Sequence, residues 1–109
     1  MTAPNKPKSK ALTFNSSGDN SAIAAPGAGL AIVIWKIAFT VAAAVNVQFF
    51  NGASPTTPLS GLLVFPAAGS MVLDGPEGFE LFRAAANTAF VANLSGAVAL
   101  GGIIWYTVE

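Results

Sequence analysis

The chain has 109 residues, of which 53% are hydrophobic and only 9% are charged, and its formal net charge at pH 7 is zero. The absence of cysteine and histidine excludes disulfides and thiolate metal sites, and it removes the most frequent general base of enzymes. An average soluble domain has about 25% charged residues, so we expect a single domain that lies in a membrane or is covered extensively by partner proteins.

The first ten residues, MTAPNKPKSK, contain three of the five Lys and Arg residues, whereas all five acidic residues follow later. No apolar segment follows these lysines, so no secretory signal peptide is predicted. The segment is too polar to fold alone, and lysines at alternate positions line one side of an extended strand. We predict that residues 1–14 form an extended basic arm, with a short first strand near its end, that binds a partner through Lys6, Lys8, Lys10, Leu12 and Phe14. Because no aromatic residue lies between the lysines, we expect no nucleic acid as partner.

Residues 29–50, GLAIVIWKIAFTVAAAVNVQFF, contain one charged side chain, Lys36, and are long enough to span a bilayer as a helix. A charge near the middle of such a span costs about 2.5–3.5 kcal/mol, and most neighbours of Lys36 are β-branched, which favours strands. Positions 33, 35, 37, 39 and 41 are all apolar, while positions 36, 38 and 40 are small or polar. This alternation is typical of half-buried strands, so we predict strands at 30–41 and 44–50 and no membrane span.

Turn-forming residues divide the rest of the chain into short apolar segments. Residues 15–20, NSSGDN, are predicted to form a turn, and Asn51–Gly52 begins a loop. Further strands are predicted at 59–66, 71–74, 79–84, 87–95 and 97–108. The Gly101–Gly102 pair indicates a bulge or bend in the last of them. About eight short strands without helical periodicity predict an all-β fold, in which residues 15–109 form a single antiparallel β-sandwich or jelly-roll-like domain behind the extended N-terminal arm.

The segment LDGPEGFE contains Asp74, Glu77 and Glu80, whose carboxylates are suitable ligands for a hard cation such as Ca²⁺. Their spacing does not match a calcium-binding loop, and a hairpin with solvated carboxylates is the favoured interpretation. Paired carboxylates also serve glycoside hydrolysis, but so short a chain has little room for a cleft that holds the sugar. We therefore predict no catalytic residue, no cofactor, no metal site and no enzyme activity.

Four large aromatic side chains lie on the predicted strands: Trp35, Phe39, Trp105 and Tyr106. Aromatic residues on alternating strands are more often part of a core or a subunit interface than of a ligand site, so we predict core or interface positions for them. Because Trp105 and Tyr106 are adjacent, they point to opposite faces of a sheet. The alternative is a platform on which Trp35, Trp105 and Tyr106 stack against a sugar.

Three stretches of the chain, SGDNSAIAAPGAGLAIVIW, LSGLLVFPAAGSMVLDGPEGFELF and NTAFVANLSGAVALGGIIWYTV, together resemble a family of small tailed-bacteriophage virion proteins. The shared features are a "GDN…I…APGAGL" run, a "G…L…PEG.FE" turn and an "N.A…NLSGAV…G…Y" strand pair. They cover most of residues 17–108 and leave out the basic arm. They are signatures of turns and strands, so they are more specific for a fold than for a role.

The resemblance implies a structural role, because proteins of this kind are similar to head-decoration (cement) or head-fibre components. The expected function is that of a capsid decoration protein on the outside of a phage head, where it stabilises contacts between capsomers. Its expected partners are the major capsid protein and further copies of itself, as a homotrimer, and its expected location is the virion, after assembly in the host cytoplasm. The alternative is a receptor- or glycan-binding module of a phage fibre or tail.

Overall fold

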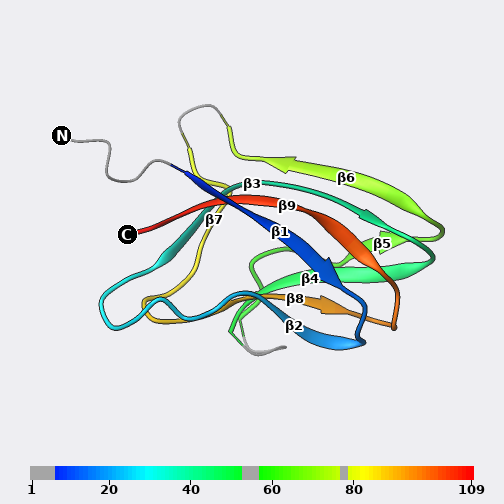
Figure 1. Ribbon diagram of the computed structural model, residues 1–109, viewed down its shortest axis with the longest axis horizontal. Coiled ribbons are helices and arrows are strands. Elements are labelled where there is room, and N and C mark those ends of the chain that lie inside the picture. The colour runs from blue at the N-terminus through cyan, green and yellow to red at the C-terminus, as the bar shows by residue number, and fades with distance from the viewer. Residues whose placement is uncertain (1–6, 53–56, 77–78) are drawn as a thin grey trace.

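The computed structural model of the protein describes residues 7–52, 57–76 and 79–109, and these form strands without a helix (Figure 1). In this part of the chain no helix is long and apolar enough to cross a membrane. The strands are β1 (Lys8–Phe14), β2 (Gly18–Ile23), β3 (Ile32–Val41), β4 (Val45–Asn51), β5 (Leu63–Phe65), β6 (Gly69–Asp74), β7 (Phe82–Arg83), β8 (Phe90–Leu94) and β9 (Leu100–Val108).

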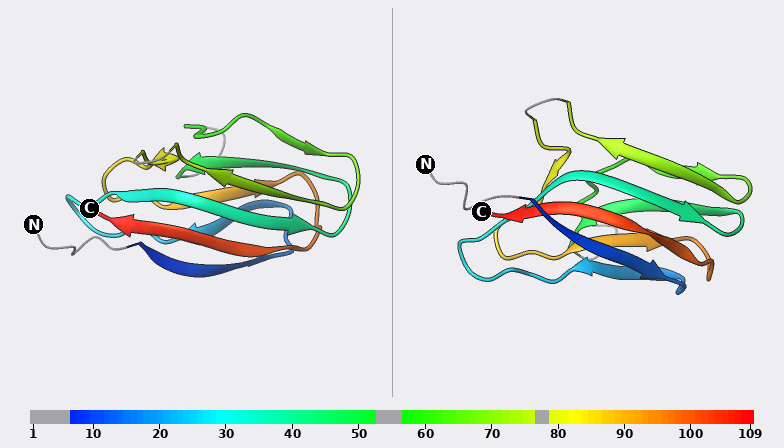
Figure 2. Two further views of the ribbon diagram at one scale, coloured as in Figure 1. Left: turned by 90° about the horizontal axis from the view of Figure 1, so that it is seen from above. Right: turned by 45° about the horizontal axis from the view of Figure 1, so that its top comes forward.

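The strands form two antiparallel sheets that pack face to face. Sheet A has the order β1-β9-β3-β6, with the short β7 also paired to β3, and sheet B has the order β2-β8-β4-β5. Strands at corresponding positions in the two sheets follow one another in the chain, as β1 and β2 do. Four short connections therefore cross between the sheets at one end of the molecule, on the right in Figure 1 and from two other directions in Figure 2. This is the strand order of a jelly roll, and the predicted all-β sandwich is confirmed.

The core between the sheets is aliphatic and aromatic. The ring of Phe49 in β4 stacks on Phe90 of β8, with 5.4 Å between ring centroids. Phe39 of β3 meets the rings of Phe49 and Phe65 edge to face, at 5.9 Å and 5.7 Å. Aromatic pairs in these arrangements contribute about 0.5–1.5 kcal/mol beyond the area that they bury. Rings from both sheets thus hold the sandwich together.

β3 changes the face that it presents to the core at Trp35. Ile34 pairs with Tyr106 of β9, and Lys36 pairs with Trp105, so Trp35 is the extra residue of a β-bulge. The core-facing residues of β3 are Ile32 and Ile34 before the bulge, and Ile37, Phe39 and Val41 after it. The predicted strands at 30–41 and 44–50 are confirmed as β3 and β4. The expected unbroken apolar face on odd positions is wrong, because the bulge shifts the alternation by one residue.

The N-terminal segment differs from the predicted arm. Lys8–Phe14 is strand β1, which pairs with β9 along its whole length. Leu12 is buried in the core and Phe14 packs against it. Burial of these apolar side chains and a complete ladder of backbone hydrogen bonds favour the strand over a free extended segment. The sandwich therefore includes residues that we placed in the arm, and residues 1–6 lie outside the described part of the chain.

The predicted turn at 15–20 is wrong, and so is the bulge, one of the two alternatives predicted for Gly101–Gly102. The predicted turn at 15–20 contains the start of β2, because Gly18–Ile23 pairs with β8. The register of β9 with β1 and β3 runs through Gly101 and Gly102 without a shift, so there is no bulge at this pair. A side chain at Gly102 would instead collide with the Ala38 carbonyl oxygen and with Phe39. Glycine is present there because β3 passes too close for a Cβ atom.

Candidate functional site

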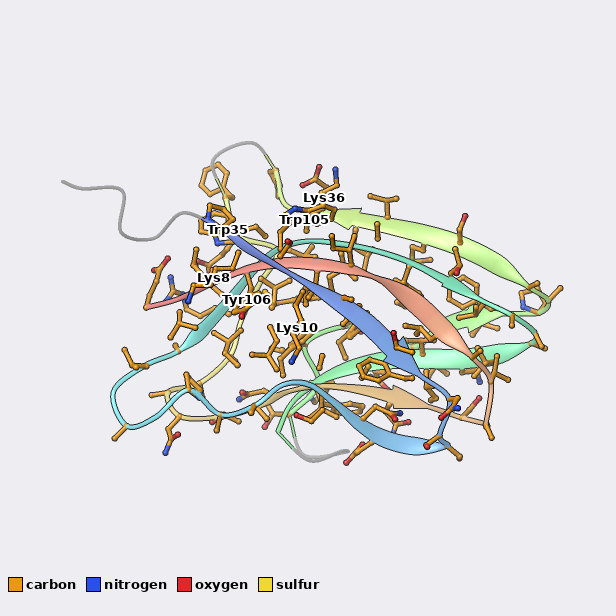
Figure 3. All side chains as sticks on the ribbon, viewed as in Figure 1. Lys8, Lys10, Trp35, Lys36, Trp105 and Tyr106 are labelled. Carbon is orange, nitrogen blue, oxygen red and sulfur yellow. The ribbon has the colours of Figure 1, made fainter. Side chains whose placement is uncertain are left out.

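The outer face of sheet A carries a row of aromatic and charged residues. Ser9, Trp105, Lys36 and Asp74 are successive cross-strand neighbours from β1 to β6. The adjacent row contains the core residues Ile104 and Ile37, so this row points away from the core. Figure 3 shows Lys36 beside Trp105, and Trp35 further than either from the four short connections.

A groove with a volume of about 480 Å³ lies over this row, and we call it the tryptophan groove. Binding sites for small molecules commonly have volumes of about 300–1,000 Å³. Its lining residues are Pro7, Trp35, Lys36, Asp74, Gly75, Pro76, Phe79 and Trp105. Both tryptophans of the chain are therefore in one site.

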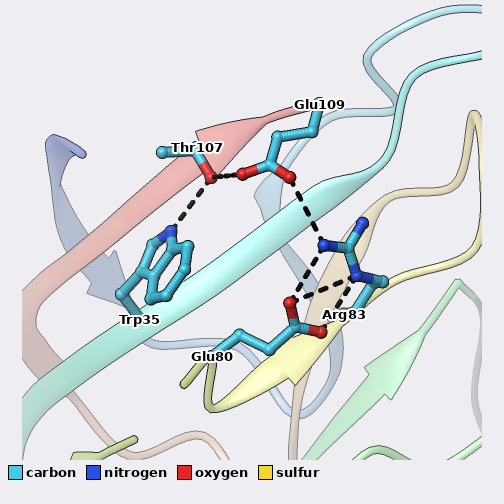
Figure 4. Close-up of polar contacts among 5 residues, drawn as sticks. All are labelled: Trp35, Glu80, Arg83, Thr107 and Glu109. Atoms are coloured by element: carbon cyan, nitrogen blue, oxygen red, sulfur yellow. Dashed lines mark hydrogen bonds and ion pairs between the residues drawn. The ribbon is translucent and has the colours of Figure 1, made fainter. Parts of the chain in front are cut away.

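A chain of polar contacts fixes the orientation of Trp35 (Figure 4). Its indole Nε1–H donates a hydrogen bond to Oγ1 of the buried Thr107 over 2.9 Å, and the Thr107 hydroxyl donates to Glu109 Oε2 over 3.0 Å. Arg83 then bridges two carboxylates, with 2.9 Å from its Nε to Glu80 Oε2 and 3.3 Å from its Nη2 to Glu109 Oε1. The hydrogen-bonded Glu80 carboxylate raises the pKa of Arg83 above its ordinary value. The bulged tryptophan is thus held by residues from β7 and the end of β9.

The charged groups of the groove do not form an ion pair with each other. Lys36 Nζ lies 5.4 Å from the centroid of the Trp105 ring, a distance at which a cation is attracted to the face of an indole. Asp74 is the cross-strand neighbour of Lys36, and within the described residues its carboxylate forms no salt bridge. The described residues of the groove therefore present aromatic rings, one carboxylate and one ammonium group. Such a set can bind a ligand by stacking and hydrogen bonding.

The four predicted aromatic residues divide between the core and this groove. Phe39 is buried in the core, and Tyr106 packs against it from the inner face of β9. Trp35 and Trp105 are half-buried and line the groove. The expectation that Trp105 and Tyr106 point to opposite faces is confirmed, and Tyr106 is not part of an outer platform.

The predicted partner-binding residues of the N-terminal segment do not act as one group. Leu12 and Phe14 belong to the sandwich interior, while Lys8 and Lys10 are exposed on the same side of β1 (Figure 3). Their cross-strand neighbours, Tyr106 and Ile104, are inward-facing residues. Inward-pointing charges on an edge strand discourage pairing with another chain. Lys6 lies outside the described residues.

The acidic cluster is also divided. Asp74 lines the groove, Glu80 is paired with Arg83, and Glu77 lies outside the described residues. Among the residues that the structure describes, no group of three or more potential metal ligands is close enough to hold an ion.

A second surface of interest is the side of the sandwich formed by the edge strands β5 and β6. Val64 of β5 is 63% exposed, and Val72 of β6 is 61% exposed. Leu62, just before β5, is exposed as well. Val64 pairs with Asn46 and points to the outer face of sheet B, whereas Val72 pairs with Ala38 and points to the outer face of sheet A. The two valines therefore flank this edge from opposite faces, and we call Leu62, Val64 and Val72 together the β5–β6 side. The opposite edge of the sandwich, made by β1 and β2, instead exposes Lys8, Lys10 and Asp19.

Sequence reasoning did not identify Pro7, Pro76 and Phe79 as members of the groove. Phe79 is 68% exposed, the highest value among the large apolar residues described, and its position in the segment LDGPEGFE was the available signal.

Comparison of the chain with protein-family models, with curated proteins and with solved structures found no match.

Proposed function

We propose that this protein is a structural component of a phage virion, a capsid decoration (cement) protein that assembles as a closed homo-oligomer, such as a trimer, on the outside of the head. In this role it binds the major capsid protein and stabilises contacts between capsomers. It performs no catalysis. Support comes from the resemblance of three stretches of sequence to small virion proteins and from the character of its exposed edges.

The contrast between the two sides of the sandwich carries this proposal. Edge strands with free backbone groups can pair with other chains, and soluble proteins usually protect them with charges. β1 has such protection in Lys8 and Lys10, whereas the β5–β6 side exposes Leu62, Val64 and Val72 without a lysine or arginine on either strand. Obligate subunit interfaces are apolar in the same way. The β5–β6 side therefore suits contact with further copies of the protein. The edge along β1 that exposes Lys8 and Lys10, which we call the basic edge, suits an acidic capsid surface.

The test is attachment of the purified protein to phage heads that lack it. The wild-type protein should cosediment with these heads and saturate a fixed number of sites. A Lys8→Ser/Lys10→Ser double variant should attach more weakly at low salt, and the difference from wild type should shrink at high salt because surface charges are screened. A Lys36→Ser variant, which changes a lysine outside the basic edge, is the control. Failure of the wild-type protein to attach at any salt concentration would overturn the proposal.

A second candidate function is a receptor- or glycan-binding module of a fibre or tail. The tryptophan groove favours it, since three aromatic side chains line one concave surface. The two functions differ in location, so antibody labelling of intact virions separates them. Labelling spread over the head supports decoration, and labelling confined to fibres or the tail supports the receptor-binding module.

A further inference from the structure

The strongest feature outside the proposed assembly surfaces is the tryptophan groove. We propose that it binds a neutral saccharide, which stacks an apolar ring face on the aromatic side chains and donates hydroxyl hydrogen bonds to Asp74. The inference rests on the groove alone and holds whether the protein decorates a head or belongs to a fibre. Its test is therefore independent of attachment to heads.

Two aromatic side chains of the groove have features of a binding surface: Trp35 is held in one orientation, and Phe79 is exposed. Trp35 is oriented by its 2.9 Å hydrogen bond to Thr107, so its ring is fixed before any ligand arrives. Phe79 is 68% exposed beside it in the same groove. A large exposed apolar side chain in a concave site is typical of a binding surface. Fixed rings lose little conformational entropy when a ligand stacks on them.

The charges of the groove favour a ligand without net charge. Among the residues that the structure describes, the lining contains one carboxylate, Asp74, and one ammonium group, Lys36. The ammonium already lies over the Trp105 ring at 5.4 Å, so it is only partly available to an anion. A phosphate or a polyanion would be attracted by Lys36 and repelled by Asp74. A cationic ligand would be attracted by Asp74 and repelled by Lys36. Neither class of ion gains a net electrostatic attraction.

The hydrogen-bonding groups favour a saccharide over a proline-rich peptide, which also docks in aromatic-lined grooves. Each proline lacks a backbone N–H, so a proline-rich segment offers few donors to the Asp74 carboxylate and compensates poorly for its desolvation. The indole N–H of Trp35, a suitable donor to peptide carbonyls, is already bonded to Thr107. Sugar hydroxyl groups both donate and accept, so they satisfy Asp74 and Lys36 together.

The two tryptophans make the experiment direct. Because both line the groove, the intrinsic tryptophan fluorescence of the whole chain reports on this site. We would titrate the full-length protein with cellobiose, maltose, lactose and N,N′-diacetylchitobiose up to about 10 mM, which detects complexes at the weak end of the affinity scale. Sialyllactose and a proline-rich peptide serve as anionic and peptide comparators. At least one neutral sugar should change the emission saturably, and more strongly than either comparator.

Two variants locate the binding. Phe79→Ala should weaken the sugar by about tenfold, the loss expected for one stacking contact, and it removes an exposed side chain, so the fold should be retained. Val64→Ala removes an equally exposed side chain from the other sheet and should leave the affinity unchanged. Circular dichroism checks that both variants are folded. The proposal is overturned by a flat titration with all four sugars, by preferential binding of the peptide or of sialyllactose, or by an equal effect of the two variants.

Discussion

The backbones of β9 and β3 lie very close together at Gly102, and replacing this glycine tests that distance directly. A Cβ atom there would lie 2.7 Å from the Phe39 Cα atom and would also meet the Ala38 carbonyl oxygen. Both are backbone atoms that cannot rotate away, so the strands themselves would have to move. We expect Gly102→Ala to lower the free energy of unfolding by about 1–3 kcal/mol, as other overpacked substitutions do. Urea denaturation followed by circular dichroism measures the change.

The neighbouring glycine provides a matched control. A Cβ atom at Gly101 would meet only the Leu12 carbonyl oxygen, at 4.0 Å, and would point away from the core. Gly101→Ala should therefore be neutral or slightly stabilising, because alanine restricts the unfolded chain more than glycine does. Equal stability of the two variants would show that β3 does not pass as close to Gly102 as the structure has it.

At the scale of elements, β1 is a largely polar strand that is held in sheet A by the burial of one leucine. Its residues are polar except near the end, yet Leu12 is buried in the core. We expect Leu12→Ala to cost about 2–5 kcal/mol, the range for truncating a buried leucine. Lys10→Ala, two residues away and exposed, should change stability by less than about 0.5 kcal/mol. Thermal unfolding of both variants measures this, and a negligible effect of Leu12→Ala would indicate that β1 is not docked on β9.

The strand content of the chain was predictable because apolar and polar residues alternate, but the face of each strand was not always predictable. In β3 the segment from Ile32 to Ile34 is apolar on both faces, so alternation there carries no information about which side is buried. The bulge at Trp35 depends on pairing with Tyr106 and Trp105 of β9, more than sixty positions away in the chain. β2 was missed for a similar reason, since its turn-like sequence GDNSAI is a strand only because β8 lies beside it.

The candidate site was predictable in part, for the same physical reason. Trp35 and Trp105 were recognisable as aromatic residues on strands, but their meeting at one groove follows from the β3–β9 register. Tyr106 was grouped with them by its neighbourhood in sequence, and the pleat places it on the inner face instead. Phe79 and Pro76 enter the site through a loop, and loop positions have no periodicity from which to infer a neighbour.

At the scale of the whole molecule, the jelly roll separates three surfaces. The tryptophan groove lies over the outer face of sheet A, the basic edge lies along β1, and the β5–β6 side lies on the other edge. The three surfaces share no residue, so assembly and ligand binding do not require the same side chains, although Val72 and Asp74 lie on the same face of β6. This separation is why the proposed decoration role and saccharide binding can be tested independently.

The oligomeric state tests the most general inference from the composition. The chain is 53% hydrophobic. Among the described residues, three of the five exposed large apolar side chains, Leu62, Val64 and Val72, belong to the β5–β6 side, and exposed apolar side chains favour burial against a partner. We expect the wild-type protein to sediment as a closed oligomer that persists on dilution. A Val64→Lys/Val72→Lys double variant should sediment as a monomer, because each interface would then bury charges without partners.

The control for this experiment is a variant with the same added charge on the opposite edge. Ser9 and Thr13 are exposed on β1, so Ser9→Lys/Thr13→Lys also adds two lysines to an edge strand but should leave the oligomer intact. Each of the four positions is exposed in the isolated chain, so none of the substitutions should unfold it, and circular dichroism checks this. A wild-type protein that is monomeric and soluble at all concentrations would remove the main physical support for assembly through the β5–β6 side. An oligomer that both double variants retain equally would place the interface on another surface of the sandwich.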